Sequence, residues 1–521
     1  MLNDRYWECP VALTKKEELI CKRLKSHGKL FVFLRKYRHL IFNDDINKQL
    51  IAMYADHPKG KPPVPAAQLA MATLLQTYEQ KSDAGATQEA MFDKRWQMVL
   101  NCLSDESPPF SQGTLCDFRH RLIKHNMDVT LLEHTVHIAK EFGGFGSTQL
   151  RVALDSAPLQ GAGRVEDTFN LVGHALELIV DCAAHIKQVT AERIILEAGA
   201  KLIGVSSIKA ALDIDWSDPA EKHNAINTLL LDVTAIEQWI EKQPSYVTEH
   251  KELKESLSLL STVLTQNIEP DPDGGSRIIK GTAADRRISI SDPDMRHGRK
   301  SSSRTINGFK QHIAIDLESK LILATCLRPA NEAEHKASEL LKPKVLRYGS
   351  VGEMSIDRGY LAADWTAELY KEGKNVIAKP WTPAAKGKYS KKAFKIDLTL
   401  AQVTCPAGNT VSISGKKEER AKFPANKCNE CQQKAQCTSS KRGRIVSIHK
   451  DEKMMQELAF YIETAEGRAN ARERVKVEHS LASVCNRKGP RARYIGLRLN
   501  EFDLNRTAMI TNLHISLNLA A

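Results

Sequence analysis

The spacing of apolar residues predicts a helical region early in the chain. The segments FVFLRKYRHLIF and AAQLAMATLLQTYE carry apolar side chains at helical intervals, and the Pro-rich KGKPPVP separates them. A turn followed by a basic helix is predicted within SPPFSQGTLCDFRHRLIKH. We therefore predict a helical domain over residues 28–125, preceded by an N-terminal segment of residues 1–27.

Strand-like runs follow this region. LRVALDSAPL is a β-rich run that leads up to an acid, and so is MSIDRGY much further along. GFKQHIAID and LILATCL are separated by a short turn, which predicts a β-hairpin. Patterns such as LVGHALELIVDCAAHIKQV predict long amphipathic helices between the first run and the hairpin, and the chain ends in further helices.

These elements predict an α/β fold with a mixed sheet. We expect one core built from residues 148–164, 306–380 and 455–521. A helical insertion of residues 165–268 and a basic, cysteine-bearing insertion of residues 381–450 interrupt this core. A chain of 521 residues is too long for one compact core, which agrees with several domains.

Composition adds a preferred partner. The net charge is +12 and the pI is about 9.0, which favours a polyanion. Residues 380–450 hold 15 Lys and Arg against 4 Asp and Glu, a surplus of 11, as expected of a face that neutralises phosphates. The chain has no apolar run of membrane-spanning length, and its first residues have no apolar core of signal-peptide length, so we expect neither a membrane span nor a signal peptide. Most of its cysteines are scattered singly, which indicates a reduced, cytoplasmic protein.

Two acids lie at the ends of strand-like runs. Asp155 follows RVAL and Asp357 follows EMSI. Either one alone is explained equally well as a turn or capping residue. On neighbouring strands the two carboxylates would face one another and repel, and a divalent cation such as Mg²⁺ or Mn²⁺ would relieve that repulsion. Two such ions can support an in-line phosphodiester displacement, which requires a third carboxylate.

The best candidate for the third carboxylate is Glu478 in RANARERVKVEHSLASV. Arg474 precedes it by four positions, so both side chains share one helical face. Glu473 is a competitor nearby. The alternative explanation is an ordinary surface pair between Arg474 and Glu478, which contributes little to stability.

Four cysteines are clustered instead of scattered. Cys405, Cys428, Cys431 and Cys437 follow one another at intervals of 23, 3 and 6 positions. A CxxC pair with two further thiols can close a structural Zn²⁺ site, and His449 can replace one of them. The alternative is four unrelated reduced thiols.

In these stretches the sequence resembles the DDE transposases of bacterial insertion sequences. The resemblance rests on ALDSAPLQGAGRVEDTFNL, DPDMRHGRKSSSRTINGFKQHIAID, LRPANEAEH, MSIDRGY and RVKVEHSLASVCNRKGPRARYIG, in this order. It implies an RNase H-like core in which Asp155, Asp357 and Glu478 hold the metal ions. The related signature Tyr-x2-Arg-x3-Glu-x6-Lys has Ala471 and Cys485 at its first and last positions.

The resemblance also implies a function. We expect a transposase that binds the inverted repeats of a mobile element, cuts the DNA ends and joins them to target DNA, as a homodimer in the synaptic complex. Arg474 is expected to hold the scissile phosphate in line. The alternatives are a metal-dependent nuclease of the same fold and an inactive, transposase-derived DNA-binding protein. The candidate DNA contacts are Arg119, Arg121, Lys124, His297, Arg299, Lys300, Lys391, Lys392, Arg442 and Arg444.

Overall fold

The computed structural model describes most of the chain. The described residues are 6–7, 10–25, 28–54, 63–146, 149–205, 207–281, 283, 285–299, 304–380, 387–415 and 419–521. Lys300, one of the candidate DNA contacts, lies outside them.

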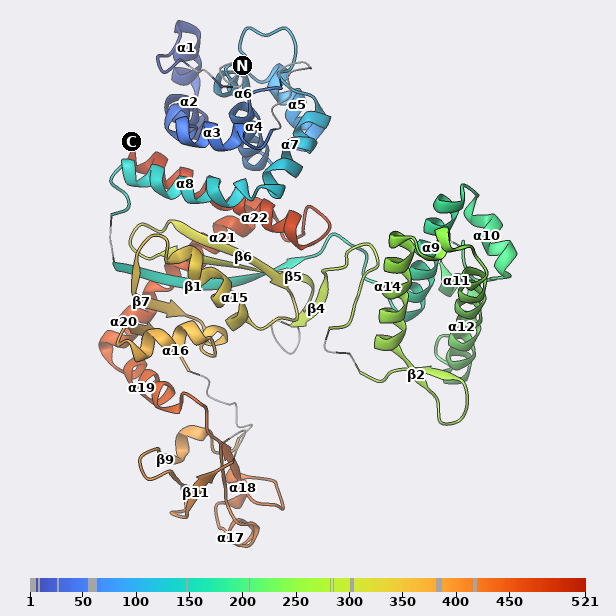
Figure 1. The fold of residues 1–521 in the computed structure, drawn as a ribbon. Helices are drawn as coiled ribbons and strands as arrows, with labels where there is room; N and C mark the ends of the chain where they lie inside the picture. The colour runs from blue at the N-terminus through green and yellow to red at the C-terminus, as the bar shows by residue number, and fades with distance from the viewer. Residues whose placement is uncertain are drawn as a thin grey trace.

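Within the described residues, eight helices form the N-terminal part of the fold (Figure 1). They are α1 (Lys15–Arg23), α2 (Lys29–Ile41), α3 (Asp44–Ile51), α4 (Ala66–Tyr78), α5 (Asp83–Phe92), α6 (Lys94–Leu100), α7 (Gln112–Lys124) and α8 (Met127–Glu141). Every residue of α4 from Ala66 to Thr77 is buried, as expected of a helix at the centre of a bundle. The predicted helical character of this region is confirmed.

A mixed sheet follows, with six strands among the described residues. They are β1 (Gln149–Gln160), β4 (Arg296–Arg299), β5 (Thr305–Asp316), β6 (Ile322–Pro329), β7 (Ser350–Ile356) and β8 (Asn375–Ile377). Their order is β6-β5-β1-β7-β8, and β4 pairs with the start of β5 that β6 leaves free. The antiparallel hairpin of β5 and β6 was predicted and is confirmed. β7 runs parallel to β1, and β8 runs parallel to β7.

Helices cover both faces of the sheet. They are α15 (Glu334–Val345), α16 (Asp364–Lys371), α19 (Glu452–Glu463), α20 (Ala465–Glu473), α21 (Val475–Lys488) and α22 (Leu497–Leu519). Side chains alternate between the two faces along a strand. Ala153 of β1 therefore shares an apolar cluster with Val477 of α21, whereas Leu154 shares another with Leu341 of α15. α21 and α22 lie on one face, and α15 and α16 lie on the other.

A helical body is inserted between β1 and β4, beside the sheet (Figure 1). It contains α9 (Thr168–Lys187), α10 (Ala191–Ala198), α11 (Ile208–Leu212), α12 (Pro219–Glu241), α13 (Ser245–Thr248), α14 (Lys251–Asn267), β2 (Ile268–Pro270) and β3 (Ser276–Ile278). α9, α12 and α14 share an apolar core of their own. By length and composition α9 is apolar enough to cross a membrane, but 61% of that window is buried inside the protein.

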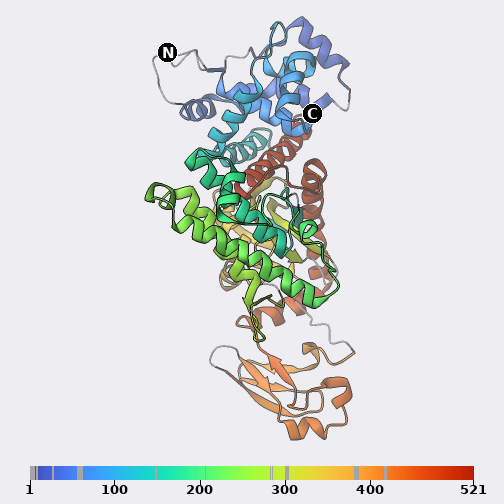
Figure 2. The same ribbon diagram turned by 90° about the vertical axis from the view of Figure 1, so that its right-hand side faces the viewer.

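A small antiparallel sheet, which we call the cysteine module, lies at the opposite end of the molecule from the N-terminal helices (Figure 2). It contains β9 (Lys395–Asp397), β10 (Gln402–Thr404), β11 (Thr410–Ser414), α17 (Ala425–Asn429), α18 (Lys434–Cys437), β12 (Arg420–Lys422) and β13 (Ile445–Ser447). Its strands were not predicted because none exceeds five residues, which is too short for an alternating pattern to stand out. Its buried core consists of Phe394, Val403, Ala421, Phe423, Val446 and Ile448.

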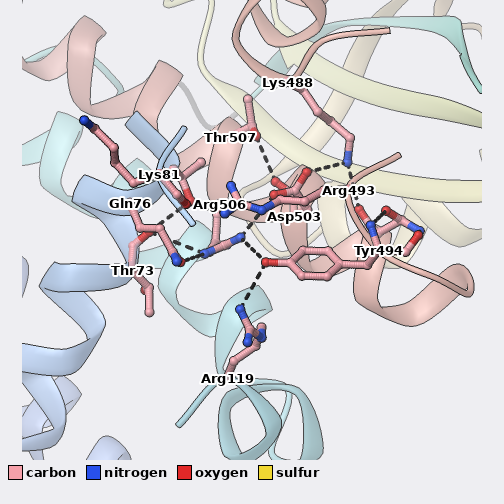
Figure 3. Close-up of polar contacts among 12 residues, drawn as sticks. Thr73, Gln76, Lys81, Arg119, Lys488, Arg493, Tyr494, Asp503, Arg506 and Thr507 are labelled. Atoms are coloured by element: carbon pink, nitrogen blue, oxygen red, sulfur yellow. Dashed lines mark hydrogen bonds and ion pairs between the residues drawn. The ribbon is translucent and has the colours of Figure 1, made fainter. Parts of the chain in front are cut away.

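A buried ionic group joins α22 to α21 and α4 (Figure 3). The Asp503 carboxylate lies 2.9 Å from Lys488 Nζ and 3.1 Å from the Arg506 guanidinium. Arg506 also donates to the Gln76 side chain at 3.1 Å. Burial raises the pKa of Asp503, but the charges of Lys488 and Arg506 outweigh it, so the pKa is lowered overall. The group thus ties the last helix of the chain to the N-terminal bundle.

We predict that Asp503→Asn lowers the free energy of unfolding by about 3–5 kcal/mol, because it leaves two buried cations without their anion. Because folding lowers the pKa of Asp503, its carboxylate stabilises the fold at pH values above the ordinary pKa of the group. This stabilisation is lost as the pH falls. The difference from wild type should therefore shrink on acidification. Denaturant midpoints measured between neutral pH and about pH 3 check this. Glu255→Gln, which breaks an exposed pair, is the control and should change little.

Candidate active site

The pairing of β1 with β7 brings the two aspartates together. Leu154 on β1 is paired in parallel register with Ile356 on β7. Asp155 and Asp357 are the next residues on these adjacent strands, so they lie side by side. Asp155 stays within β1 opposite Ile313, whereas Asp357 leaves its strand and caps a short turn.

Backbone groups hold both carboxylates. Asp155 Oδ1 accepts a hydrogen bond from the Ser156 amide at 2.9 Å, and its side chain is 16% exposed. Asp357 Oδ1 accepts one from the Arg358 amide at 2.8 Å, and Asp357 is exposed. One carboxylate is thus largely shielded and the other faces solvent, which suits a site that must admit a substrate.

Glu478 reaches the same place from a helix. It lies in the first turn of α21, whose buried Val477 and Leu481 pack in the cluster beneath β1. Arg474 lies between the acids: its guanidinium is 3.4 Å from Asp155 Oδ1 and 2.6 Å from Glu478 Oε1. Glu473, the competing candidate, instead pairs with Lys476.

The electrostatics agree with this arrangement. The pKa of Asp155 is raised, first by burial and also by the negative charges of Glu478 and Asp357. Arg474 and the Ser156 amide act in the opposite direction. Arg474 contacts two of these three carboxylates, and the negative charges that act on Asp155 favour binding of a further cation.

The carboxylate oxygens of Asp155, Asp357 and Glu478 do not all lie within 4.8 Å of one another. Among the described residues, the group whose ligand atoms all lie within 4.8 Å of one another is Glu79, Glu89 and Asp93, in the N-terminal helices. Arg95 and Lys81 already pair with these three acids. We therefore do not treat that group as a metal site.

The four clustered cysteines meet in the cysteine module. All four line one cavity of about 20 Å³. Burial raises the pKa of the Cys437 thiol, and the other three thiols raise it further, whereas Arg444 lowers it. No three of these sulfur atoms, all within the described residues, lie mutually within 4.8 Å. His449 does not line this cavity.

The basic residues of α7 differ in their surroundings. Arg119 is 7% exposed, pairs with Asp83 at 2.7 Å and lies over the Tyr494 ring. Burial raises the pKa of Asp83, but hydrogen bonds from Arg119 and Gln76 lower it overall. Lys124 is exposed. The Arg119 side chain is thus engaged inside the protein.

The other candidate DNA contacts also fall into two groups. The Lys391 ammonium pairs with Glu452. Arg444 donates to the backbone carbonyls of Cys437 and Tyr389, so it braces the cysteine module. Arg121 is half-buried over an aromatic ring. The exposed candidates of this set are His297, Arg299, Lys392 and Arg442.

Two family models match the chain. Residues 404–515 match a transposase DDE domain, and residues 19–121 match a transposase domain (DUF772). These two matches support a DDE transposase. The first match includes Glu478, whereas Asp155 and Asp357 lie outside both matches. No curated protein and no solved structure matches the chain.

One carboxylate near the candidate site was missed from the sequence. Glu334, in the first turn of α15, accepts a hydrogen bond from Ser156 Oγ at 2.6 Å, directly beside Asp155. The signal available in the sequence was its place in LRPANEAEH, just after the hairpin. That stretch holds two glutamates, and their spacing does not distinguish them.

We predict that Arg119→Ala destabilises the protein by about 2–4 kcal/mol, because it leaves the Asp83 carboxylate without its main partner. Affinity for nonspecific duplex DNA should change little. Denaturant unfolding and a DNA titration measure the two effects. Lys124→Ala, on the exposed side of the same helix, is the control for stability and should leave the free energy of unfolding nearly unchanged. An Arg119→Ala protein with wild-type stability and weakened DNA binding would show that this side chain acts on DNA.

Proposed function

We propose that this protein is a DNA transposase that binds the terminal inverted repeats of an insertion sequence and catalyses metal-dependent strand cleavage and strand transfer. The observation that carries the proposal is the register of Leu154 with Ile356, which sets Asp155 beside Asp357. Glu478 is linked to Asp155 through the Arg474 guanidinium that both carboxylates contact.

We further propose that the core is RNase H-like. The support is the strand order β6-β5-β1-β7-β8, with three antiparallel strands followed by two strands parallel to β1. Residues 148–164, 306–380 and 455–521 would make up this core. Residues 165–268 and 381–450 would be the two insertions, and residues 28–125 would form the DNA-binding domain.

The carboxylates fit a pair of Mg²⁺ or Mn²⁺ ions. Their donor atoms are all oxygen. The charge of Arg474 does not offset burial and the neighbouring negative charges, because the pKa of Asp155 remains raised. When bound, two such ions activate the attacking oxygen and stabilise the leaving one. Asp155 and Asp357 would hold the ions from the sheet, and Glu478 would hold one from α21. Arg474 contacts both Asp155 and Glu478, so it is our candidate for contacting the scissile phosphate.

The DNA would follow the exposed basic residues. Phosphate contacts from such side chains supply affinity and salt dependence without sequence information. A homodimer holding two DNA ends fits a reaction that joins both ends to one target. The residues proposed for this path are Lys124, His297, Arg299, Lys392 and Arg442.

The cysteine module is proposed to bind one structural Zn²⁺. Four thiols that line one small cavity supply the donor set of a closed tetrahedral site. Its apolar core consists of only six buried side chains, so bound metal would supply missing stability. Cys405, Cys428, Cys431 and Cys437 would be the ligands.

We predict that Asp357→Asn lowers strand cleavage by at least about 1,000-fold, or about 4 kcal/mol in the activation barrier, because a metal ligand is lost. DNA affinity should be retained. Cleavage and joining of a labelled element end, with its flanking repeats, measure the effect. Asp364→Asn is the control, because that side chain is exposed and pairs with Lys450.

The same assay separates the alternatives. Cleavage without joining of a pre-cut end would indicate a nuclease. Activity that survives Asp357→Asn would contradict the proposed catalytic site. DNA binding with neither reaction in the wild-type protein would indicate an inactive DNA-binding descendant.

We predict that the purified protein contains one Zn²⁺ per chain and that Cys428→Ser with Cys431→Ser removes it. The cysteine module should then become sensitive to protease, because metal binding and folding are coupled. Elemental analysis and limited proteolysis measure both effects. Cys182→Ser, in the helical insertion, is the matched control. Wild-type protein purified without zinc and resistant to chelator would contradict the prediction.

A further inference from the structure

A buried polar network lies behind Asp155, on the opposite face of the sheet. Ser156 follows Asp155 on β1, so its side chain points to the α15 face. There Ser156 Oγ donates to Glu334 Oε1 at 2.6 Å. His312, the register partner of Ser156 on β5, is 2.7 Å from the Tyr360 hydroxyl. His312 and Tyr360 are at most 1% exposed.

The same glutamate touches the turn that carries Asp357. A Cβ atom on Gly359 would lie 1.8 Å from Glu334 Oε2, so the carboxylate packs directly on the backbone at that position. A side chain at this position would have to displace the Glu334 carboxylate. Glu334 therefore contacts the residue after Asp155 with one oxygen and the turn after Asp357 with the other.

Tyr360 anchors that turn from its far end. Its backbone amide donates to the Asp357 carbonyl at 3.0 Å. Burial raises the pKa of Tyr360 well above its usual value, and burial lowers the pKa of His312 to about 3. Both groups are therefore uncharged, and the hydrogen bond between them connects the turn to β5.

We propose that Glu334 is a positioning residue that sets the separation of Asp155 and Asp357. It lies in the first turn of α15, a helix fixed to the sheet by the buried Ala337 and Leu341. Its two oxygens connect the strand of one aspartate to the turn of the other. This role rests on the proposed metal-binding function of the aspartates.

A positioning role makes a specific demand on metal binding. Residues that orient metal ligands typically account for about 10–100-fold in metal affinity when they are removed. Glu334→Ala should therefore weaken Mn²⁺ binding by about this factor. Ser156→Ala removes the hydrogen bond without removing any charge and should have an effect in the same direction. Because both substitutions break one connection, their effects should not add in the double variant.

The experiment is a calorimetric titration of the full-length protein with MnCl₂, without DNA. The proteins compared are the wild type, Glu334→Ala, Ser156→Ala, the double variant, Asp357→Asn and the control Glu318→Ala, an exposed glutamate in the hairpin turn. Thermal unfolding of the metal-free proteins shows whether each variant is folded at the titration temperature. Glu334→Gln is the conservative control, since the amide oxygen can still accept from Ser156 and affinity should be largely kept. Should Glu334→Ala not fold, Ser156→Ala carries the test.

Each outcome decides between the two levels of the proposal. Weakened, non-additive binding in the Glu334 and Ser156 variants, with unchanged binding in the control, supports the positioning role. The positioning role is overturned if Glu334→Ala binds Mn²⁺ with wild-type affinity, or if Glu334→Ala weakens binding and Ser156→Ala does not. In both cases the proposed function stands as long as Asp357→Asn abolishes binding. Wild-type protein that binds no Mn²⁺, or binds it equally after Asp357→Asn, overturns the proposed function itself.

Discussion

The parallel pairing of β1 with β7 is the constraint on which the candidate site depends. The two strands are separated by nearly two hundred residues, and the only thing that makes Asp155 and Asp357 neighbours is the register that sets Leu154 opposite Ile356. A slip of one residue would move one carboxylate to the other face of the sheet. That register is held because Val152, Leu154 and Ile356 are buried in one apolar cluster on the α15 face.

Electrostatic repulsion is the cost of that pairing, and the surrounding residues offset it only in part. Burial and two neighbouring carboxylates raise the pKa of Asp155, whereas Arg474 and a backbone amide lower it. One guanidinium cannot balance three acids. A site of this kind is suited to bind cations because its native contacts leave negative charge uncompensated. Behind Asp155, by contrast, hydrogen bonds join Ser156 to Glu334 and His312 to Tyr360, and such bonds favour one geometry.

The helix that carries Glu478 is connected to the N-terminal bundle through the last helix of the chain. Lys488, at the end of α21, pairs with Asp503 of α22, and Arg506 of α22 reaches Gln76 of α4 (Figure 3). The nearest lysine to the position that the family signature reserves for one is thus buried in an ion pair. Through these contacts α21, which carries Glu478, is attached to the N-terminal bundle.

The sequence by itself determined the local elements and the identity of the candidate acids. Apolar spacing identified the helical N-terminal region and the β5–β6 hairpin, and the ordered motifs singled out Asp155, Asp357 and Glu478, because periodicity and short motifs are local properties. Tertiary structure alone decided what these residues meet. Contacts between segments far apart in the chain bury Arg119 against Asp83, bring Arg474 to Asp155, and bring Glu334 to Ser156 and Gly359. Such contacts follow from strand register and helix packing, which no single stretch of sequence encodes.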